Sequence, residues 1–202
     1  MKFNTRELAT IAVFGTLWGI SEITMGSVLN ALNVPFSGAV LGAIGLLIAL
    51  IGRVFIPKRG SILFFGLIAM LLKLFNLGGI VIGPMVGILS EAILAELVLT
   101  LSKKPRLFHF MLAGSIGVTW NLVQPFVTGP LLFGRTLFIV WLDLLDSGSR
   151  ILGLDNSAIT LIAGVLILIY IVIGSAAGWL AWMIAKQLQI RMGRNQEEIS
   201  EQ

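Results

Sequence analysis

The stretch SAITLIAGVLILIYIVIGSAAGWLAWMIAKQ, from Ser157 to Gln187, decides the fold class of this chain. Its only charged side chain is Lys186, near its carboxyl end. A helix needs about 20 mostly apolar residues to cross the hydrocarbon core of a bilayer. This stretch therefore predicts a membrane-spanning helix that is long enough to project beyond the bilayer.

The composition of the whole chain agrees with that prediction. Of the 202 residues, 57% are apolar and only 12% are charged, whereas soluble domains carry about 25% charged residues. There is no cysteine and one histidine, His109, so disulfides, thiol nucleophiles and Cys-based or His-rich metal sites are excluded. We expect no metal site and no cofactor.

Five further segments are apolar enough to be spans. They are Leu8–Ala31, Phe36–Ile56, Ser61–Phe75, Ile80–Leu101 and Leu107–Val127. Together with Ser157–Gln187 they predict an all-α membrane protein, a six-span transmembrane helical bundle in one domain, residues 1–194. Thr5 is the expected N-cap of the first helix. Lys73 is near the end of the short third segment, and we expect its side chain to extend to the membrane interface.

The longest connection, Thr128–Asn156, separates the fifth and sixth spans. Its apolar residues recur at near-helical spacing around Trp141, which predicts an amphipathic helix at the membrane interface. A short seventh span over Leu131–Leu145 is the alternative. Asp143 and Asp146 favour the interfacial helix, because carboxylates are costly inside lipid.

The distribution of Lys and Arg predicts the orientation, since cytoplasmic loops are enriched in these residues. Eleven of these residues lie near the two termini or near the alternate loops that share the termini's side of the membrane. Two lie on the opposite side. The eleven are Lys2, Arg6, Arg53, Lys58, Arg59, Lys103, Lys104, Arg106, Lys186, Arg191 and Arg194, and the two are Arg135 and Arg150. Both termini are therefore expected in the cytoplasm, with residues 195–202 as a disordered tail. The net charge of +4 is explained by these loops, and nucleic acid is not an expected partner.

Carboxylates within membrane spans are candidate functional residues because burying them is costly. Glu22 shares one helix face with glycines of the first span, so it is expected to point into the bundle. Glu91 lies near mid-membrane on a face of small residues in the fourth span. Either residue could bind a ligand or bond to a neighbouring helix. Glu96 is about 140° around from Glu91, and its nearness to Lys103 and Arg106 favours a structural role.

Trp120, Asn121 and Gln124 form a polar stripe in the fifth span. Tryptophan can stack on a ring, and the two amides can bond to its heteroatoms. Hydrogen bonding between helices is an equal alternative for each residue alone. Because these residues and Glu22 all fall in the outer half of the membrane, we predict a cavity open to the outside.

Two other patterns bear on function. The chain has no phosphate-binding Gly-Lys-Ser/Thr loop, no His-Glu-x-x-His and no Gly-x-Ser-x-Gly, so we expect no enzyme activity. Ala177, Ala181 and Ala185 repeat every fourth residue in the sixth span. Such faces allow close helix packing, within the bundle or, less favoured, against a partner.

One stretch of the fourth span, from Gly83 to Leu97 (GPMVGILSEAILAEL), resembles the corresponding helix of substrate-binding (S) components of energy-coupling-factor (ECF) transporters. This stretch is similar to thiamine-precursor-type members in particular, and the turn Pro35-Phe36-Ser37-Gly38 adds a little to the resemblance. The first span departs from that family, with Gly15-x-x-x-Gly19 where Ala-x-x-x-Ala is frequent. The resemblance implies a six-span subunit of the prokaryotic cytoplasmic membrane that binds a vitamin or precursor. It also implies a transmembrane coupling subunit and ABC ATPases as partners.

The leading hypothesis is a substrate-binding subunit for uptake of a small polar nutrient, thiamine-like or another nitrogen heterocycle. In this hypothesis Glu22 and Glu91 pair with positive charge or accept ring N–H groups, Trp120 stacks, and Asn121 and Gln124 orient the ligand. The segment around Trp141 caps the outer mouth. The alternatives are an autonomous proton-coupled carrier or channel and a membrane scaffold or assembly protein.

Overall fold

The computed structural model describes residues 3–75, 82–102, 104–155 and 158–200, and only the backbone of residues 30 and 192–200. That part of the chain is helical, with no strand in it. The helices are α1 (Thr5–Ala31), α2 (Ser37–Phe55), α3 (Ser61–Leu72) with the 3-10 turn η1 (Lys73–Phe75), α4 (Ile82–Leu101), α5 (Leu107–Phe133), α6 (Leu137–Leu152) and α7 (Ile159–Ser200). Lys2, Lys103 and the predicted span starts at Ile80 and Ser157 lie outside the described residues.

Each of the six predicted spans corresponds to a helix, and five are long and apolar enough to cross a membrane: α1, α2, α4, α5 and α7. The sixth, Ser61–Phe75, is shorter. At 1.5 Å per α-helical and 2.0 Å per 3-10 residue it extends about 24 Å, less than a hydrocarbon core of about 30 Å. The protein is thus a multi-pass helical membrane protein, with five candidate spans in the part of the chain that the structure describes.

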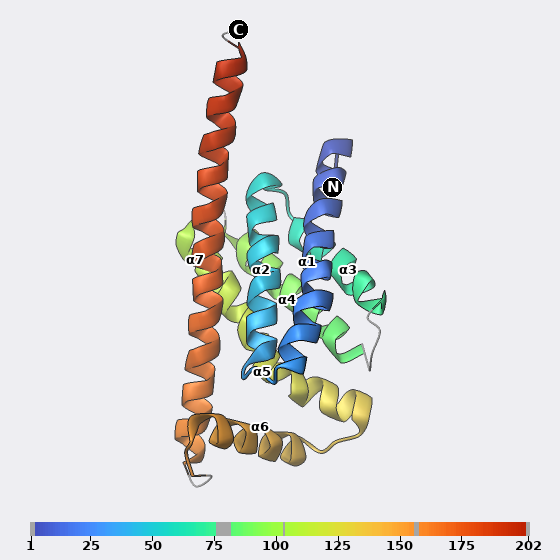
Figure 1. Ribbon diagram of the computed structural model, residues 1–202, viewed down its shortest axis with the longest axis vertical. Coiled ribbons are helices and arrows are strands. Elements are labelled where there is room, and N and C mark those ends of the chain that lie inside the picture. Colours follow the sequence, from blue (N-terminus) through green and yellow to red (C-terminus); the bar gives the residue numbers. More distant parts are fainter. Residues whose placement is uncertain (1–2, 76–81, 103, 156–157, 201–202) are drawn as a thin grey trace.

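The helices form two layers (Figure 1). One layer contains α1, α2 and α7, and the other contains α3, α4 and α5. Helix α2 is central and contacts all five of the other bundle helices. Both chain ends lie at one end of the bundle, and α6 lies across the opposite end.

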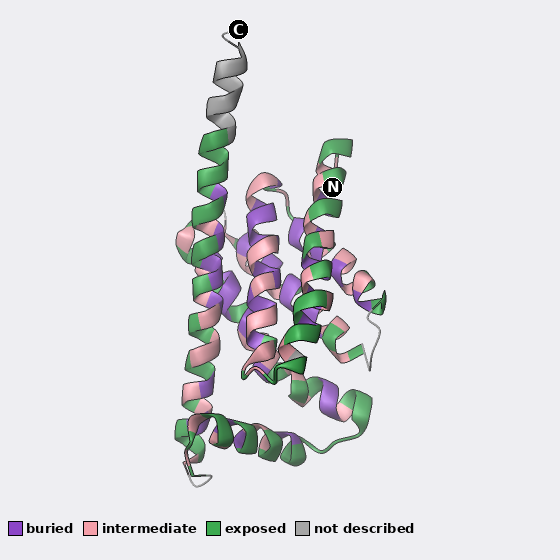
Figure 2. Cartoon of the chain, in the orientation of Figure 1, coloured by how far each residue is buried: buried purple, intermediate pink, exposed green. Residues whose placement is uncertain are grey.

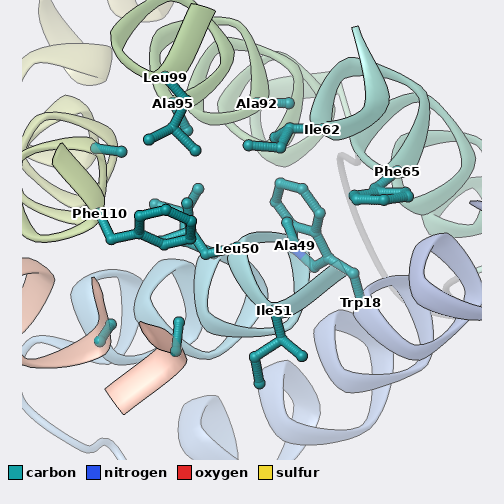
Figure 3. Close-up of a cluster of buried hydrophobic side chains, with 14 of the residues drawn as sticks. Trp18, Ala49, Leu50, Ile51, Ile62, Phe65, Ala92, Ala95, Leu99 and Phe110 are labelled. Atoms are coloured by element: carbon teal, nitrogen blue, oxygen red, sulfur yellow. The ribbon is translucent and has the colours of Figure 1, made fainter. Parts of the chain in front are cut away.

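The hydrophobic core lies between these layers (Figure 3). Trp18 of α1, Leu50 of α2 and Phe65 of α3 are fully buried there, beside Ala92 of α4. In contrast, many large apolar residues are exposed, and exposed residues occupy much of the outside of the bundle (Figure 2). Apolar side chains on both the inside and the outside are expected of helices whose solvent is lipid.

Glycines bring α5 and α7 into direct backbone contact. A Cβ added at Gly114 would collide with the carbonyl oxygen of Gly174, and one at Gly178 with that of Phe110. The neighbouring face of Ala177, Ala181 and Ala185 is buried in the core. This small-residue face therefore packs within the bundle, the favoured alternative.

Several helix ends differ from the sequence prediction. Asn4, not Thr5, caps α1: its Oδ1 accepts the N–H of Glu7 at 2.8 Å, and Glu7 Oε2 accepts the N–H of Asn4 at 2.8 Å. This reciprocal capping box satisfies two otherwise unpaired donors. Helix α5 continues six residues past the predicted end at Val127, to Phe133. Helix α7 continues to Ser200, into the segment predicted to be disordered.

Glu96 has a structural position, but its partners differ from those expected. Its carboxylate accepts the N–H groups of Gly60 at 2.8 Å and Ile62 at 3.0 Å, at the start of α3. The side chain of Arg53, which is itself buried, lies 3.7 Å from Glu96 Oε1. An anionic group at a helix N-terminus satisfies free N–H groups and interacts favourably with the helix dipole. Glu96 therefore joins α2, α3 and α4.

Helix α6 occupies the predicted connection, packed against α5 and α7. Thr136 caps it by accepting the N–H of Ile139 at 3.3 Å. Leu145 is buried against Ile162 and Leu166 of α7, while Leu137 and Phe138 are exposed. The helix is shorter than the candidate spans and lies across them (Figure 1).

Candidate functional site

A cavity of about 310 Å³ opens among α1, α2, α4 and α5. Its lining comes from the second half of α1, the first turns of α2, the first half of α4 and the second half of α5, so it lies toward the end of the bundle opposite the chain termini. The lining residues are Glu22, Gly38, Leu41, Gly42, Gly83, Pro84, Gly87, Ile88, Glu91, Asn121, Gln124 and Phe133. Four of the five predicted site residues are thus together: Glu22, Glu91, Asn121 and Gln124.

Glu91 and Asn121 form the polar centre of the cavity. Asn121 Nδ2 donates to Glu91 Oε1 at 2.6 Å, and more weakly to the carbonyl of Val118 at 3.3 Å. Glu91 is only 3% exposed, and its second carboxylate oxygen, Oε2, is buried with no hydrogen-bond partner among the described residues. A buried oxygen of this kind costs free energy unless something pairs with it. Glu91 Oε2 is therefore available to a ligand or a proton.

Glycines make room for these side chains. A Cβ added at Gly42 would lie 2.7 Å from both Asn121 Nδ2 and Glu91 Oε1, and one at Gly87 would lie 2.6 Å from Gln124 Oε1. Gln124 Nε2 donates to the carbonyl of Gly83 at 2.7 Å, which ties α5 to the first turn of α4. The cavity's polar groups therefore depend on the absence of side chains on α2 and α4.

The prediction for Lys73 is wrong. Its side chain does not extend to the interface; it is buried, and Nζ lies 3.2 Å from Glu22 Oε2 and 2.8 Å from the carbonyl oxygen of Glu22. The cause is local: α3 ends at Leu72, and the 3-10 turn that follows directs Lys73 toward α1. Glu22 therefore has its own counter-charge.

Trp120 lies apart from the other four predicted residues. It lines a different, largely apolar cleft of about 450 Å³, beside Leu94 of α4 and Ile171 of α7. The reason is the helical period, because consecutive residues are 100° apart and Asn121, not Trp120, faces α2 and Glu91. Stacking by Trp120 on a ligand in the polar cavity is not compatible with this arrangement.

The predicted cap also differs. Among the described residues that line the polar cavity, none belongs to α6; Phe133, the last residue of α5, lines it instead. Phe133 also lines a cavity of about 300 Å³ between α5 and α6. Trp141 packs near Phe126, with 6.2 Å between ring centroids. Helix α6 is therefore next to the site without closing it.

Two contributors escaped the sequence analysis. A lone lysine at the end of an apolar run is equally typical of an interfacial anchor, so Lys73 gave no distinct signal. Its burial depends on where α3 ends, and no local motif marks that end. Gly42 belongs to a helix with small residues throughout, and only the cavity distinguishes it from Gly45 or Gly52.

The chain was compared with protein-family models, with characterised proteins and with solved structures, and none of them matches it.

Proposed function

We propose that this protein is the membrane-embedded substrate-binding subunit for uptake of a small polar vitamin or precursor, thiamine-like or another nitrogen heterocycle, in an ECF-type ABC transporter. The observation that supports it is the cavity at the end of the bundle away from the chain termini, lined by Glu22, Glu91, Asn121 and Gln124. Its volume of about 310 Å³ is at the lower end of ligand sites, which run from about 300 to 1,000 Å³.

The proposal includes six spans, with Ser61–Phe75 as a short one, and α6 as an interfacial helix. Both termini then lie in the cytoplasm of a prokaryote, and the cavity opens outward. A transmembrane coupling subunit and ABC ATPases supply energy, since the chain has no nucleotide-binding motif of its own.

The test has two arms, binding and uptake. Purified protein is titrated with thiamine and with its aminopyrimidine moiety, and labelled thiamine uptake is measured in cells with and without a coupling subunit and its ATPases. We expect saturable binding, and uptake only when the partners are present. Binding that is unchanged in Glu91→Gln and Gln124→Ala variants would rule out this cavity as the site.

A second candidate function, an autonomous proton-coupled carrier, is favoured by one observation. Glu91 Oε2 is buried without a partner among the described residues, and carboxylates inside membranes are frequent proton carriers. Substrate uptake by this chain alone in proteoliposomes, driven by a pH gradient without ATP, distinguishes this function from the first.

A further inference from the structure

In the cavity, as far as the structure describes the chain, the hydrogen-bond donors of the amide side chains are paired, whereas several acceptors are not. Both hydrogen bonds of Asn121 use its amide N–H groups, and the amide nitrogen of Gln124 donates to the carbonyl of Gly83. The open positions among the described residues are acceptors: Glu91 Oε2, and the amide oxygens of Asn121 and Gln124, to which no described group donates.

The orientation of both amides follows from their partners. A carboxylate and a backbone carbonyl accept hydrogen bonds and do not donate them. Asn121 must therefore turn its NH2 group toward Glu91, and Gln124 must turn its NH2 group toward Gly83. Their oxygens are left for a ligand, so the complementary ligand is a hydrogen-bond donor.

The charges add a second restriction. With all three groups ionised, Glu22, Glu91 and Lys73 sum to one negative charge. Lys73 pairs with Glu22 at 3.2 Å, and the side chains of both are only 6% exposed. A buried charge requires an opposite charge nearby, and among the described residues Glu22 has a cationic partner whereas Glu91 has only its hydrogen bond from Asn121.

We propose that the cavity selects monocations with N–H donors, and that Lys73 sets this valence by neutralising Glu22, so that Glu91 alone faces the positive charge of the ligand. The inference rests on the proposed function, which makes this cavity the substrate site, and it narrows the substrate to one chemical class. Glu91 contacts the ligand, whereas Glu22 and Lys73 determine the preference for a monocation by setting the net charge near Glu91.

The probes are three benzene derivatives that differ in charge at neutral pH. Benzylamine is a monocation, benzyl alcohol is neutral, and p-xylylenediamine is a dication. Their dissociation constants are measured by ligand-observed NMR with the full chain in nanodiscs, after subtraction of the signal from empty nanodiscs. The wild-type protein is expected to prefer benzylamine over the other two by about tenfold, or ~1.4 kcal/mol.

Three variants test the charge count. Glu91→Gln is expected to abolish the preference for benzylamine over benzyl alcohol. Glu22→Gln is expected to abolish it as well, because it leaves the charge of Lys73 uncompensated beside Glu91. Adding Lys73→Met to Glu22→Gln removes that charge, restores a net charge of −1 and is expected to restore the preference. Trp120→Phe, outside the cavity, is the control and is expected to keep the wild-type ratio.

The inference is overturned if the wild-type protein binds none of the probes or does not discriminate among them. It is also overturned if the Glu22→Gln/Lys73→Met variant lacks the preference while eluting as a folded, monodisperse species. If Glu22→Gln alone does not fold, the comparison of the double variant with Glu91→Gln still decides. If thiamine is taken up but the cavity does not prefer monocations, this inference alone is overturned. If the cavity prefers monocations but no uptake occurs in the presence of the coupling subunit and ATPases, the proposed function alone is overturned.

Discussion

Gly42 shows at the scale of one residue how the polar cavity depends on space. Its Cα is close to both members of the Asn121–Glu91 hydrogen bond, and an added Cβ would lie 2.7 Å from an atom of each. Real Cβ atoms are not found at such distances from neighbouring atoms, so alanine must displace one of the two side chains. Neither the Asn121 nor the Glu91 side chain can move away freely, because the hydrogen bond between them holds both in place.

We therefore predict that Gly42→Ala weakens benzylamine binding by about tenfold or more and costs about 1–3 kcal/mol of stability, as overpacking does. Ligand-observed NMR and thermal unfolding in detergent measure these effects. Gly164→Ala is the matched control, since a Cβ at Gly164 on α7 meets nothing within 4 Å. Equal affinities in the two variants would contradict the role of Gly42.

Residue positions were predictable where the helical period alone decides them. Glycine spacing placed Glu22 inside the bundle, and it is 4% exposed; the same reasoning placed Glu91 inside. The period could not show that Lys73 pairs with Glu22, because that contact joins residues 51 apart in the chain. The prediction that Trp120 belongs to the same site is wrong, because the broad face of α5 that carries Trp120, Asn121 and Gln124 extends over two clefts.

At the scale of the element, the start of α3 depends on another helix. Its N-cap, Gly60, offers no side-chain acceptor, and Glu96 of α4 accepts its N–H and that of Ile62 instead. Thr100 Oγ1 adds a bond to the same carboxylate at 2.5 Å. The sequence predicted a structural Glu96 but could not supply these partners, because a cap provided by a distant helix leaves no local motif.

Glu96→Gln is expected to lower the stability of the protein by about 1–3 kcal/mol, because it removes an acceptor and the charge opposite buried Arg53. Thermal unfolding in detergent measures the loss. Thr100→Val removes only one hydrogen bond to Glu96 and is expected to cost less. Benzylamine binding should not change in either variant, since neither side chain lines the polar cavity; a fall in affinity without loss of stability would contradict this separation.

Helix α6 gives a second prediction at this scale. Phe138 and Ser147 are nine residues apart, which places them on opposite sides of the helix, and both are exposed. If α6 lies at the interface, a nitroxide at residue 138 collides with oxygen dissolved in lipid, and one at residue 147 collides with a water-soluble nickel chelate. Electron paramagnetic resonance accessibility measures both. The natural chain has no cysteine, so Phe138→Cys and Ser147→Cys are labelled without background; lipid exposure at both sites would instead support a seventh span.

At the scale of the whole molecule, the long apolar helices were predictable because lipid imposes length and composition on each helix separately. Their arrangement in two layers with α2 at the centre was not. It depends on contacts such as those of Gly114 with Gly174, where two backbones touch, and many small-residue faces in this chain are equivalent in the sequence. Four of the residues that line the cavity were predictable from the sequence, whereas the pairing of Lys73 with Glu22 beside it was not.

The orientation of the whole bundle in the membrane can be tested at its loops. The start of α1 lies at one end of the bundle and the start of α7 at the other (Figure 1). Lys58 pairs with Glu7 near the start of α1, and Arg59 lines one cavity with Pro105, so the basic loops α2–α3 and α4–α5 lie at the first end. The positive-inside rule then predicts that Asp155→Cys, before α7, reacts with a membrane-impermeant maleimide in intact cells. Arg59→Cys, in the turn between α2 and α3, should react only after permeabilisation. The opposite pattern would turn the cavity toward the cytoplasm, where it could not collect a nutrient from outside, and the uptake proposal would fail even if the charge selectivity of the cavity were correct.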